Sequence, residues 1–231
     1  MDMDKQQGIF ISRELSREGV LYQGLIEQGF VICDQSLIEF TGLPFDVIPK
    51  ADWVFFYSSR AVQYFFNSYQ GDKNDYKWAA MGEGTAKALQ ELGIQAHFTG
   101  DGHPQNVAAA FVQVAENQVV LFPRARQSKQ SVQQLLAGRI QDVAMIVYEN
   151  RAKKDFYLPE CKILVFTSPL NVDAYFGKYT LTRHQKIVAI GHTTASSIRR
   201  LGYEVTVAAA ATEAALLESI SKVIKTAFSN D

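Results

Sequence analysis

The chain has 231 residues, of which 47% are hydrophobic and 20% are charged, and its formal net charge is −1. This length suits one large domain or two small domains, each with a true hydrophobic core. The nearly neutral charge provides no general electrostatic attraction to nucleic acid or to an anionic membrane, so neither is expected as a partner.

Two cysteines, Cys33 and Cys161, stand alone, without a second Cys or a His at metal-ligand spacing. This pattern argues against a zinc site and against a disulfide framework, and it fits a reducing compartment. The N-terminus is polar and acidic, unlike a signal peptide, and no apolar run approaches the roughly 20 residues of a membrane span. We therefore expect a cytoplasmic protein with neither a metal nor another cofactor.

Short apolar runs alternate with amphipathic ones along the whole chain. In the first half the pattern predicts strands at 8–12, 30–40 (one strand or a broken pair), 53–59, 77–82 and 95–100, with helices at 14–28, 60–69, 85–92 and 104–115. In the second half it predicts strands at 118–124, 143–150, 162–168, 186–191 and 203–209, with helices at 128–137, 169–177, 194–201 and 212–228. Such alternation indicates an α/β fold with parallel sheets covered by helices on both faces.

Two halves of the chain repeat one another. The stretch MGEGTAKALQELGI (81–94) matches IGHTTASSIRRLGY (190–203), and VFFYSSRAVQYFF (54–66) matches LVFTSPLNVDAYF (164–176). A looser match pairs Arg13, after the first strand, with Arg124. Because the order and the offset of about half the chain are kept throughout, internal duplication explains the matches better than chance does.

Each copy of the repeat carries polar residues where a strand turns into a helix. We expect Thr85 and Thr194 to cap the helices that follow Gly82 and Gly191, and Ser58 and Ser168 stand at two equivalent turns. These turns fall at the carboxyl ends of strands, where open α/β sheets bind ligands, and helix N-termini suit carboxylates or phosphates. The alternative is that each cap only stabilises its own helix.

No motif for a catalytic nucleophile, a metal or a nucleotide is present. Four arginines follow predicted strands, and they either pair with ligand carboxylates or lie on solvated faces; they are Arg13, Arg60, Arg124 and Arg126. Tyr148 ends a strand at an expected crossing between domains. A tyrosine there either packs between the domains or donates a hydrogen bond to a ligand.

In order and spacing these segments together resemble the uroporphyrinogen-III synthase family. The matching segments are DWVFFYSSRAV, MGEGTAKALQELG, LFPRARQS with the later VYEN, ILVFTSPLNVDAYF and AIGHTTASSIRRLG, and they extend from about residue 9 to 220. The resemblance implies two similar α/β domains, each with a parallel sheet flanked by helices, joined by a two-stranded linker. One domain would be discontinuous, with residues 1–34 and 152–231, and residues 35–151 would form the other.

The resemblance also implies a reaction, a site and a partner. The enzyme would be a lyase of porphyrin and haem biosynthesis that dehydrates and cyclises hydroxymethylbilane, inverting ring D through a spiro intermediate. Its site would lie in the cleft between the domains, where Tyr148 assists departure of the hydroxyl group. The substrate carboxylates would be bound by Arg13, Ser58, Arg60, Thr85, Ser168, Thr193 and Thr194. The expected state is a monomer.

The sequence departs from the family pattern at two positions and leaves two other functions open. Tyr57 stands where the family usually has Thr, and Glu83 places a carboxylate beside a predicted carboxylate-binding turn. One alternative is a two-domain protein that closes on an anionic small molecule without chemistry, since fold does not determine function. The other is a nucleotide-sugar or phosphosugar enzyme, for which only Glu83 and His192 offer catalytic groups at the turns.

Overall fold

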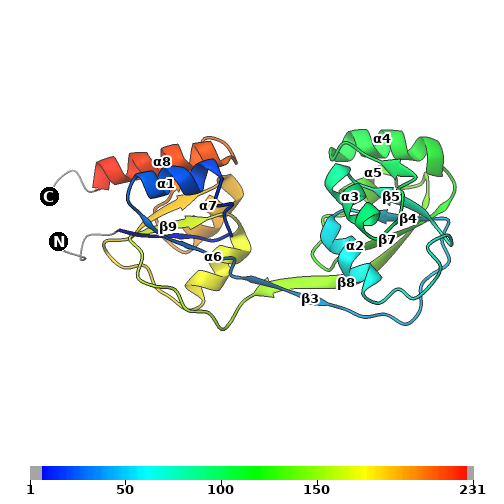
Figure 1. Ribbon diagram of the computed structural model, residues 1–231, viewed down its shortest axis with the longest axis horizontal. Helices are drawn as coiled ribbons and strands as arrows, with labels where there is room; N and C mark the ends of the chain where they lie inside the picture. Colours follow the sequence, from blue (N-terminus) through cyan, green and yellow to red (C-terminus); the bar gives the residue numbers. More distant parts are fainter. Residues whose placement is uncertain (1–6, 228–231) are drawn as a thin grey trace. The chain divides into compact units, whose positions relative to one another are not determined.

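The computed structural model describes residues 7–227, which form two compact units (Figure 1). Unit 1 contains residues up to 39 and from 151 onward, and unit 2 contains residues 40–150. The chain leaves unit 1 through β3 (Ile38–Gly42) and returns through β8 (Gln141–Ala152), and these two strands are hydrogen-bonded neighbours. Thus unit 2 is inserted in the sequence of unit 1.

Unit 1 is built on a five-stranded parallel sheet with the strand order β11-β10-β9-β1-β2. Its strands are β1 (Gly8–Ile11), β2 (Val31–Asp34), β9 (Ile163–Phe166), β10 (Lys186–Ala189) and β11 (Thr206–Val207). Its helices are α1 (Val20–Glu27), α6 (Pro169–Phe176), α7 (His192–Arg200) and α8 (Glu213–Ala227). The helices α1 and α8 cover one face of the sheet, and α6 and α7 cover the other.

Unit 2 has a six-stranded sheet with the order β3-β8-β7-β4-β5-β6, parallel from β8 to β6. Its remaining strands are β4 (Trp53–Phe56), β5 (Lys77–Ala80), β6 (Phe98–Thr99) and β7 (Val119–Ala125). Its helices are α2 (Ser59–Phe66), α3 (Glu83–Glu91), α4 (Pro104–Ala115) and α5 (Ser131–Leu135). The helices α2 and α3 pack on one face, and α4 and α5 pack on the other.

The repeat seen in the sequence is present in the topology. The strands β9, β10, β11, β1 and β2 of unit 1 occupy the same order as β4, β5, β6, β7 and β8 of unit 2. The central strands also share a register, since Ile163 lies opposite Lys186 and Trp53 lies opposite Lys77. Each unit therefore presents an equivalent set of strand-to-helix turns at the carboxyl end of its sheet.

The α/β class with helix-covered parallel sheets is confirmed. The central strands WVFF (53–56) and ILVF (163–166) are buried at every position, as two-sided coverage requires. The sequence also predicted the bounds of α4 correctly, because Pro104 is well placed at the first helical position.

Several predicted bounds were wrong. The helix expected from residue 14 begins only at Val20, because the N–H of Leu15 donates to the Asp34 carboxylate (2.9 Å) and holds residues 12–19 as a loop. The strands expected at 95–100 and 203–209 shorten to two residues each, β6 and β11 at the sheet edges. The helix expected at 128–137 is reduced to α5, and the last residue of the helix expected at 212–228 lies outside the described residues.

Candidate active site

Ser58 and Ser168 begin the equivalent helices α2 and α6. The Ser58 hydroxyl accepts from the Ala61 N–H (3.2 Å), and the Ser168 hydroxyl accepts from the Asn171 N–H (3.3 Å). Both residues have extended backbone conformations (φ −159° and −158°), as N-cap residues do. The two predicted caps therefore exist, and neither hydroxyl donates to another residue in the described part of the chain, so each could donate to a ligand oxygen.

Arg60 and Tyr148 contact the same aromatic ring. The guanidinium of Arg60 lies 3.6 Å from the centroid of the Phe40 ring, and Phe40 lies 6.3 Å from Tyr148. On α2, Tyr64 stacks on Tyr148 with ring centroids 5.1 Å apart, and its hydroxyl donates to the Phe40 carbonyl (3.2 Å). These contacts bring two of the predicted site residues into one aromatic cluster and hold the Tyr148 ring in place.

Tyr148 itself is mostly buried, with 8% of its surface exposed, in the core between the unit 2 sheet and α2. No hydrogen-bond partner of its hydroxyl is recorded among residues 7–227. The hydroxyl thus keeps its donor capacity, while the ring is held by packing.

The helices α3 and α7 begin differently from the prediction. Their N-caps are Gly82 and Gly191, neither of which has a side-chain cap, so Thr85 and Thr194 are the third residues of their helices. Both threonines are buried, with 6% and 3% of their surfaces exposed, and the predicted capping role is wrong for both. The reason is that the chain turns into the helix directly after the glycine.

A glycine N-cap leaves the first N–H groups of the helix open to a ligand. At α7 these belong to His192 and to the exposed Thr193, and the first turn holds no acidic residue. At α3 the first helical residue is Glu83, whose carboxylate already occupies the positive end of the helix dipole. The start of α7 is therefore the better anion-binding terminus of the two.

Arg13 follows β1 in unit 1 and is paired within the protein. Its guanidinium donates to the Glu213 carboxylate at 2.9 Å, and the second oxygen of Glu213 accepts from the Leu21 N–H (3.3 Å). Glu213 thus neutralises Arg13 and caps the N-terminus of α1 at the same time. Arg13 therefore has less charge to offer a ligand than the sequence suggested.

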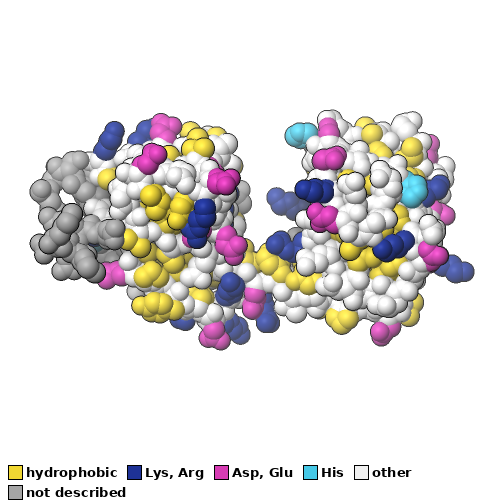
Figure 2. All heavy atoms as spheres, viewed as in Figure 1, with side chains coloured by type: hydrophobic (Ala, Val, Ile, Leu, Met, Phe, Trp, Pro, Cys, Tyr) yellow, Lys and Arg dark blue, Asp and Glu magenta, His cyan; other side chains and the backbone are white. Residues whose placement is uncertain are grey.

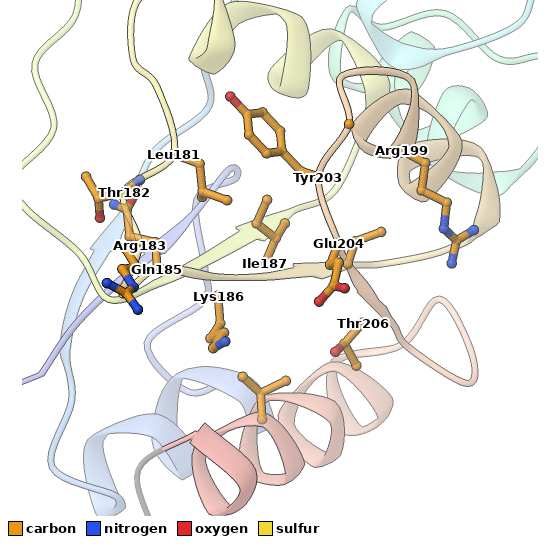
Figure 3. A pocket seen from close by; sticks show the side chains of 13 residues that line it. Leu181, Thr182, Arg183, Gln185, Lys186, Ile187, Arg199, Tyr203, Glu204 and Thr206 are labelled. Atoms are coloured by element: carbon orange, nitrogen blue, oxygen red, sulfur yellow. Dashed lines mark hydrogen bonds between the residues drawn. The ribbon is translucent and has the colours of Figure 1, made fainter. Parts of the chain in front are cut away.

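One of two surface hollows is lined by predicted site residues, and the other is not. A groove of about 570 Å³ between α2 and α3 is lined by Ser58 and Arg60 at one end and by Phe66 and Leu92 further along. A broader hollow of about 1060 Å³ in unit 1 is lined by Lys186 and Thr206, at the amino ends of their strands, and by Arg183, Tyr203 and Glu204 (Figure 3). The broader hollow lies at the opposite end of its sheet from Gly191 and includes none of the predicted site residues.

The surface charges, the possible metal ligands and the helix lengths add three facts about residues 7–227. Side chains of both signs are interspersed over the visible face of each unit (Figure 2). Within this range no group of three or more His, Cys, Asp or Glu residues is arranged to hold a metal ion, and no helix is long and apolar enough to cross a membrane.

Some residues of the site could not be found from the sequence. Asn171 is buried, donates to the Ser168 hydroxyl (2.9 Å) and accepts from the Leu37 N–H (2.8 Å), which holds the α6 cap. Tyr64 and Glu213 act in the same supporting way on Tyr148 and Arg13. No motif marks these residues; only the spacing of Tyr64 one helical turn after Arg60 offered a signal.

The fold and the strand ends indicate a class of protein, and a sequence comparison then identifies the family. Each unit by itself presents helix N-termini and at least one arginine at the carboxyl end of its parallel sheet, which is typical of α/β proteins that bind anionic groups of small molecules. A family model described as uroporphyrinogen-III synthase HemD matches residues 20–218. The chain therefore belongs to the uroporphyrinogen-III synthase family.

The chain was also compared with solved structures, and the first of the two named below shares its fold. Uroporphyrinogen-III synthetase from Helicobacter pylori 26695 is 21% identical over 94% of this chain and 99% of that chain, with a TM-score of 0.69. A mutant uroporphyrinogen III synthase from Thermus thermophilus is 15% identical over 95% of this chain and 99% of that chain, with a TM-score of 0.49. A comparison with curated protein sequences gave no match.

Proposed function

We propose that this protein converts hydroxymethylbilane to uroporphyrinogen III, as a cyclising lyase of tetrapyrrole biosynthesis. The observation that carries the proposal is the family match over residues 20–218. The family match favours this function over a receptor without chemistry and over a nucleotide-sugar or phosphosugar enzyme.

The chemistry needs little from the protein beyond conformation. Loss of the hydroxyl group from ring A as water gives an azafulvenium cation, and ring D attacks it through its substituted carbon. The resulting spiro intermediate fragments and recloses with ring D inverted. Because the electron-rich pyrroles also close without an enzyme, to the type I isomer, the protein must chiefly hold ring D against ring A in the spiro geometry.

Tyr148 is proposed to assist the departure of water by donating its hydroxyl proton or hydrogen bond to the leaving group. Support comes from the stacking of Tyr64 on its ring and from the lack of a hydrogen-bond partner for its hydroxyl among residues 7–227. The Phe40 ring contacts both the guanidinium of Arg60 and the ring of Tyr148.

The acetate and propionate arms of the substrate are proposed to bind at the carboxyl ends of both sheets. The proposed contacts are the hydroxyls of Ser58 and Ser168, the side chain of Arg60 and the open N-terminus of α7 at Thr193 and Thr194. Arg13 and Thr85 remain in the proposed set, with smaller contributions, because Arg13 is paired with Glu213 and Thr85 is buried.

We further propose that the two compact units correspond to the two domains of the family, one of them discontinuous, and that the enzyme works as a monomer in the cytoplasm. The domain proposal is supported by the division of the chain at residues 39/40 and 150/151. The cytoplasmic location is supported by Cys33 and Cys161, both of which are free thiols.

One assay tests the proposed function. Purified protein is given hydroxymethylbilane, the products are oxidised, and the type I and type III uroporphyrin isomers are separated. We expect predominantly the type III isomer. If only the spontaneous type I isomer forms, at the rate seen without protein, the proposed function is wrong.

A further inference from the structure

Arg124 lies at the carboxyl end of β7, between β4 and β8 in the unit 2 sheet. The β4–β7 register pairs Val54 with Leu121, and continuing it by three residues places Tyr57 opposite Arg124. Burial raises the pKa of the Tyr57 phenol, and the nearby positive charge of Arg124 partly offsets this rise. Arg124 is therefore a cation beside a neutral, half-buried tyrosine at the ligand-binding end of the sheet.

The guanidinium of Arg124 donates hydrogen bonds to backbone carbonyls but has no counter-charge among residues 7–227. One terminal nitrogen, Nη1, donates to the carbonyls of Ala125 (3.1 Å) and Arg126 (3.4 Å), which folds the guanidinium back over the strand end. Arg124 forms no ion pair with a carboxylate of residues 7–227, whereas Arg13 pairs with Glu213; the Nε atoms of both arginines are buried without a partner, so only the ion pair distinguishes them. A half-buried cation without a counter-charge is costly, and an anion from outside the chain would supply that charge.

The internal repeat shows why this arginine lacks a partner. Arg124 is the counterpart of Arg13, which pairs with Glu213 at the first position of α8. The helix of unit 2 that corresponds to α8 is α4, and its first residue is Pro104. Unit 2 therefore keeps the arginine and has no carboxylate at the position where unit 1 has one.

The neighbouring arginine behaves differently. Arg126 is exposed, and its Nε donates to the Glu149 carboxylate at 2.6 Å, so its charge is already neutralised within unit 2. The two arginines at the end of β7 thus differ in whether a carboxylate of the protein already neutralises their charge. This difference supplies a matched control.

We infer that Arg124 binds a carboxylate of the tetrapyrrole, in place of the internal carboxylate that its counterpart Arg13 has. The inference rests on the proposed function for the identity of the ligand. An acetate or propionate arm would accept from the terminal nitrogens of the guanidinium, since Nε is buried, in the paired geometry that arginine and carboxylate favour. Arg124 would be a binding residue, with no part in proton transfer.

The test compares Arg124→Gln and Arg124→Lys with the control Arg126→Gln. Binding is measured with uroporphyrin III, which carries eight carboxylates, through quenching of the fluorescence of Trp53 and Trp78 in unit 2. We expect Arg124→Gln to weaken binding about 10–100-fold and to raise KM similarly with little change in kcat. Arg124→Lys should show a smaller loss, because the charge stays but the fork geometry is lost, and Arg126→Gln should change binding less than about twofold.

A variant that keeps the arginine tests the repeat argument independently. Pro104→Glu restores a carboxylate at the position that Glu213 occupies in unit 1, on a helix start that favours acidic residues. We expect this variant to fold and to bind uroporphyrin III about 10-fold more weakly, because the new carboxylate competes for Arg124. In the double variant with Arg124→Gln, the Pro104→Glu change should have no further effect.

The outcomes separate this inference from the proposed function. If the wild type forms the type III isomer but folded Arg124→Gln and Arg124→Lys both bind uroporphyrin III as the wild type does, the role of Arg124 is wrong and the proposed function stands. If the wild type forms only type I yet Arg124→Gln still weakens uroporphyrin III binding selectively, the proposed function fails and carboxylate binding by Arg124 stands. Should Arg124→Gln fail to fold, equal binding by Pro104→Glu and wild type overturns the inference.

Discussion

Replacing Tyr148 by Phe removes one hydroxyl group and keeps the aromatic ring. The ring contacts with Tyr64 (centroids 5.1 Å apart) and Phe40 (6.3 Å) stay in place. Since the hydroxyl has no recorded partner among residues 7–227, its loss breaks no internal hydrogen bond. We therefore expect the free energy of unfolding to change by less than about 0.5 kcal/mol.

The effect on catalysis should be far larger. A positioned general acid contributes about 10²–10⁴-fold to the rate, which corresponds to about 2.7–5.4 kcal/mol of transition-state stabilisation. The assay follows formation of the type III isomer from saturating hydroxymethylbilane over time and subtracts the spontaneous type I reaction. We expect kcat for Tyr148→Phe to fall by about 100-fold or more, with KM nearly unchanged.

Tyr64→Phe is the matched control. It removes a hydroxyl that donates to the Phe40 carbonyl (3.2 Å), so it should lower the free energy of unfolding by about 0.5–1.5 kcal/mol. Its kcat should fall much less than that of Tyr148→Phe, because the ring stacked on Tyr148 is retained. A Tyr148→Phe enzyme whose kcat stays within about threefold of the wild type would refute the acid role of Tyr148.

Two further substitutions and one chemical modification test other parts of the structure. Gly191→Ser should raise KM several-fold and stabilise α7 slightly, because the new hydroxyl caps N–H groups proposed for the substrate; a Cβ at Gly191 meets no atom within 4 Å. Glu213→Ala should lower the free energy of unfolding in urea by about 1–3 kcal/mol, since it removes both the Arg13 pair and the cap on Leu21. Burial raises the pKa of Cys161 to about 12, so at pH 8 its alkylation, followed by mass spectrometry, should be about 1000-fold slower than that of an ordinary thiol.

Each of these has its own control. Gly82→Ser should raise KM less than Gly191→Ser, since Glu83 already occupies the N-terminus of α3. An equal rise in KM would contradict the claim that the N-terminus of α7 is the better anion-binding site of the two. Glu218→Ala breaks only an exposed pair with Lys222, and the Glu213 prediction fails if both variants lose the same stability. Alkylation of native Cys161 as fast as in urea would contradict its burial.

Local patterns account for the elements that were predicted correctly. Buried strands such as 53–56 and 163–166 read as apolar runs, and α4 begins with a proline that suits the first turn of a helix. The caps Ser58 and Ser168 follow the same logic, because an N-cap depends on hydrogen bonds within one helical turn. The repeat with constant offset predicted two equivalent sheets before any contact was known.

Contacts distant in sequence decided the remainder. The start of α1 depends on hydrogen bonds from Leu15 and Leu21 to Asp34 and Glu213, and these two acceptors lie outside the segment 14–28 from which the helix was predicted. Thr85 and Thr194 have the residue type of a cap, yet they are buried because the helix begins at the preceding glycine turn.

The sequence by itself determined the α/β class, the internal repeat and the residue types at the strand ends, because these depend on periodicity and on local turn chemistry. Only the tertiary structure decided which of those residues are free to act. Arg13 and Arg124 are equivalent in the repeat, but Glu213 neutralises the first, whereas the second has no ion pair among residues 7–227 and Pro104 stands at the position equivalent to Glu213. The free charge of an arginine depends on what folding brings to within a few ångströms of it.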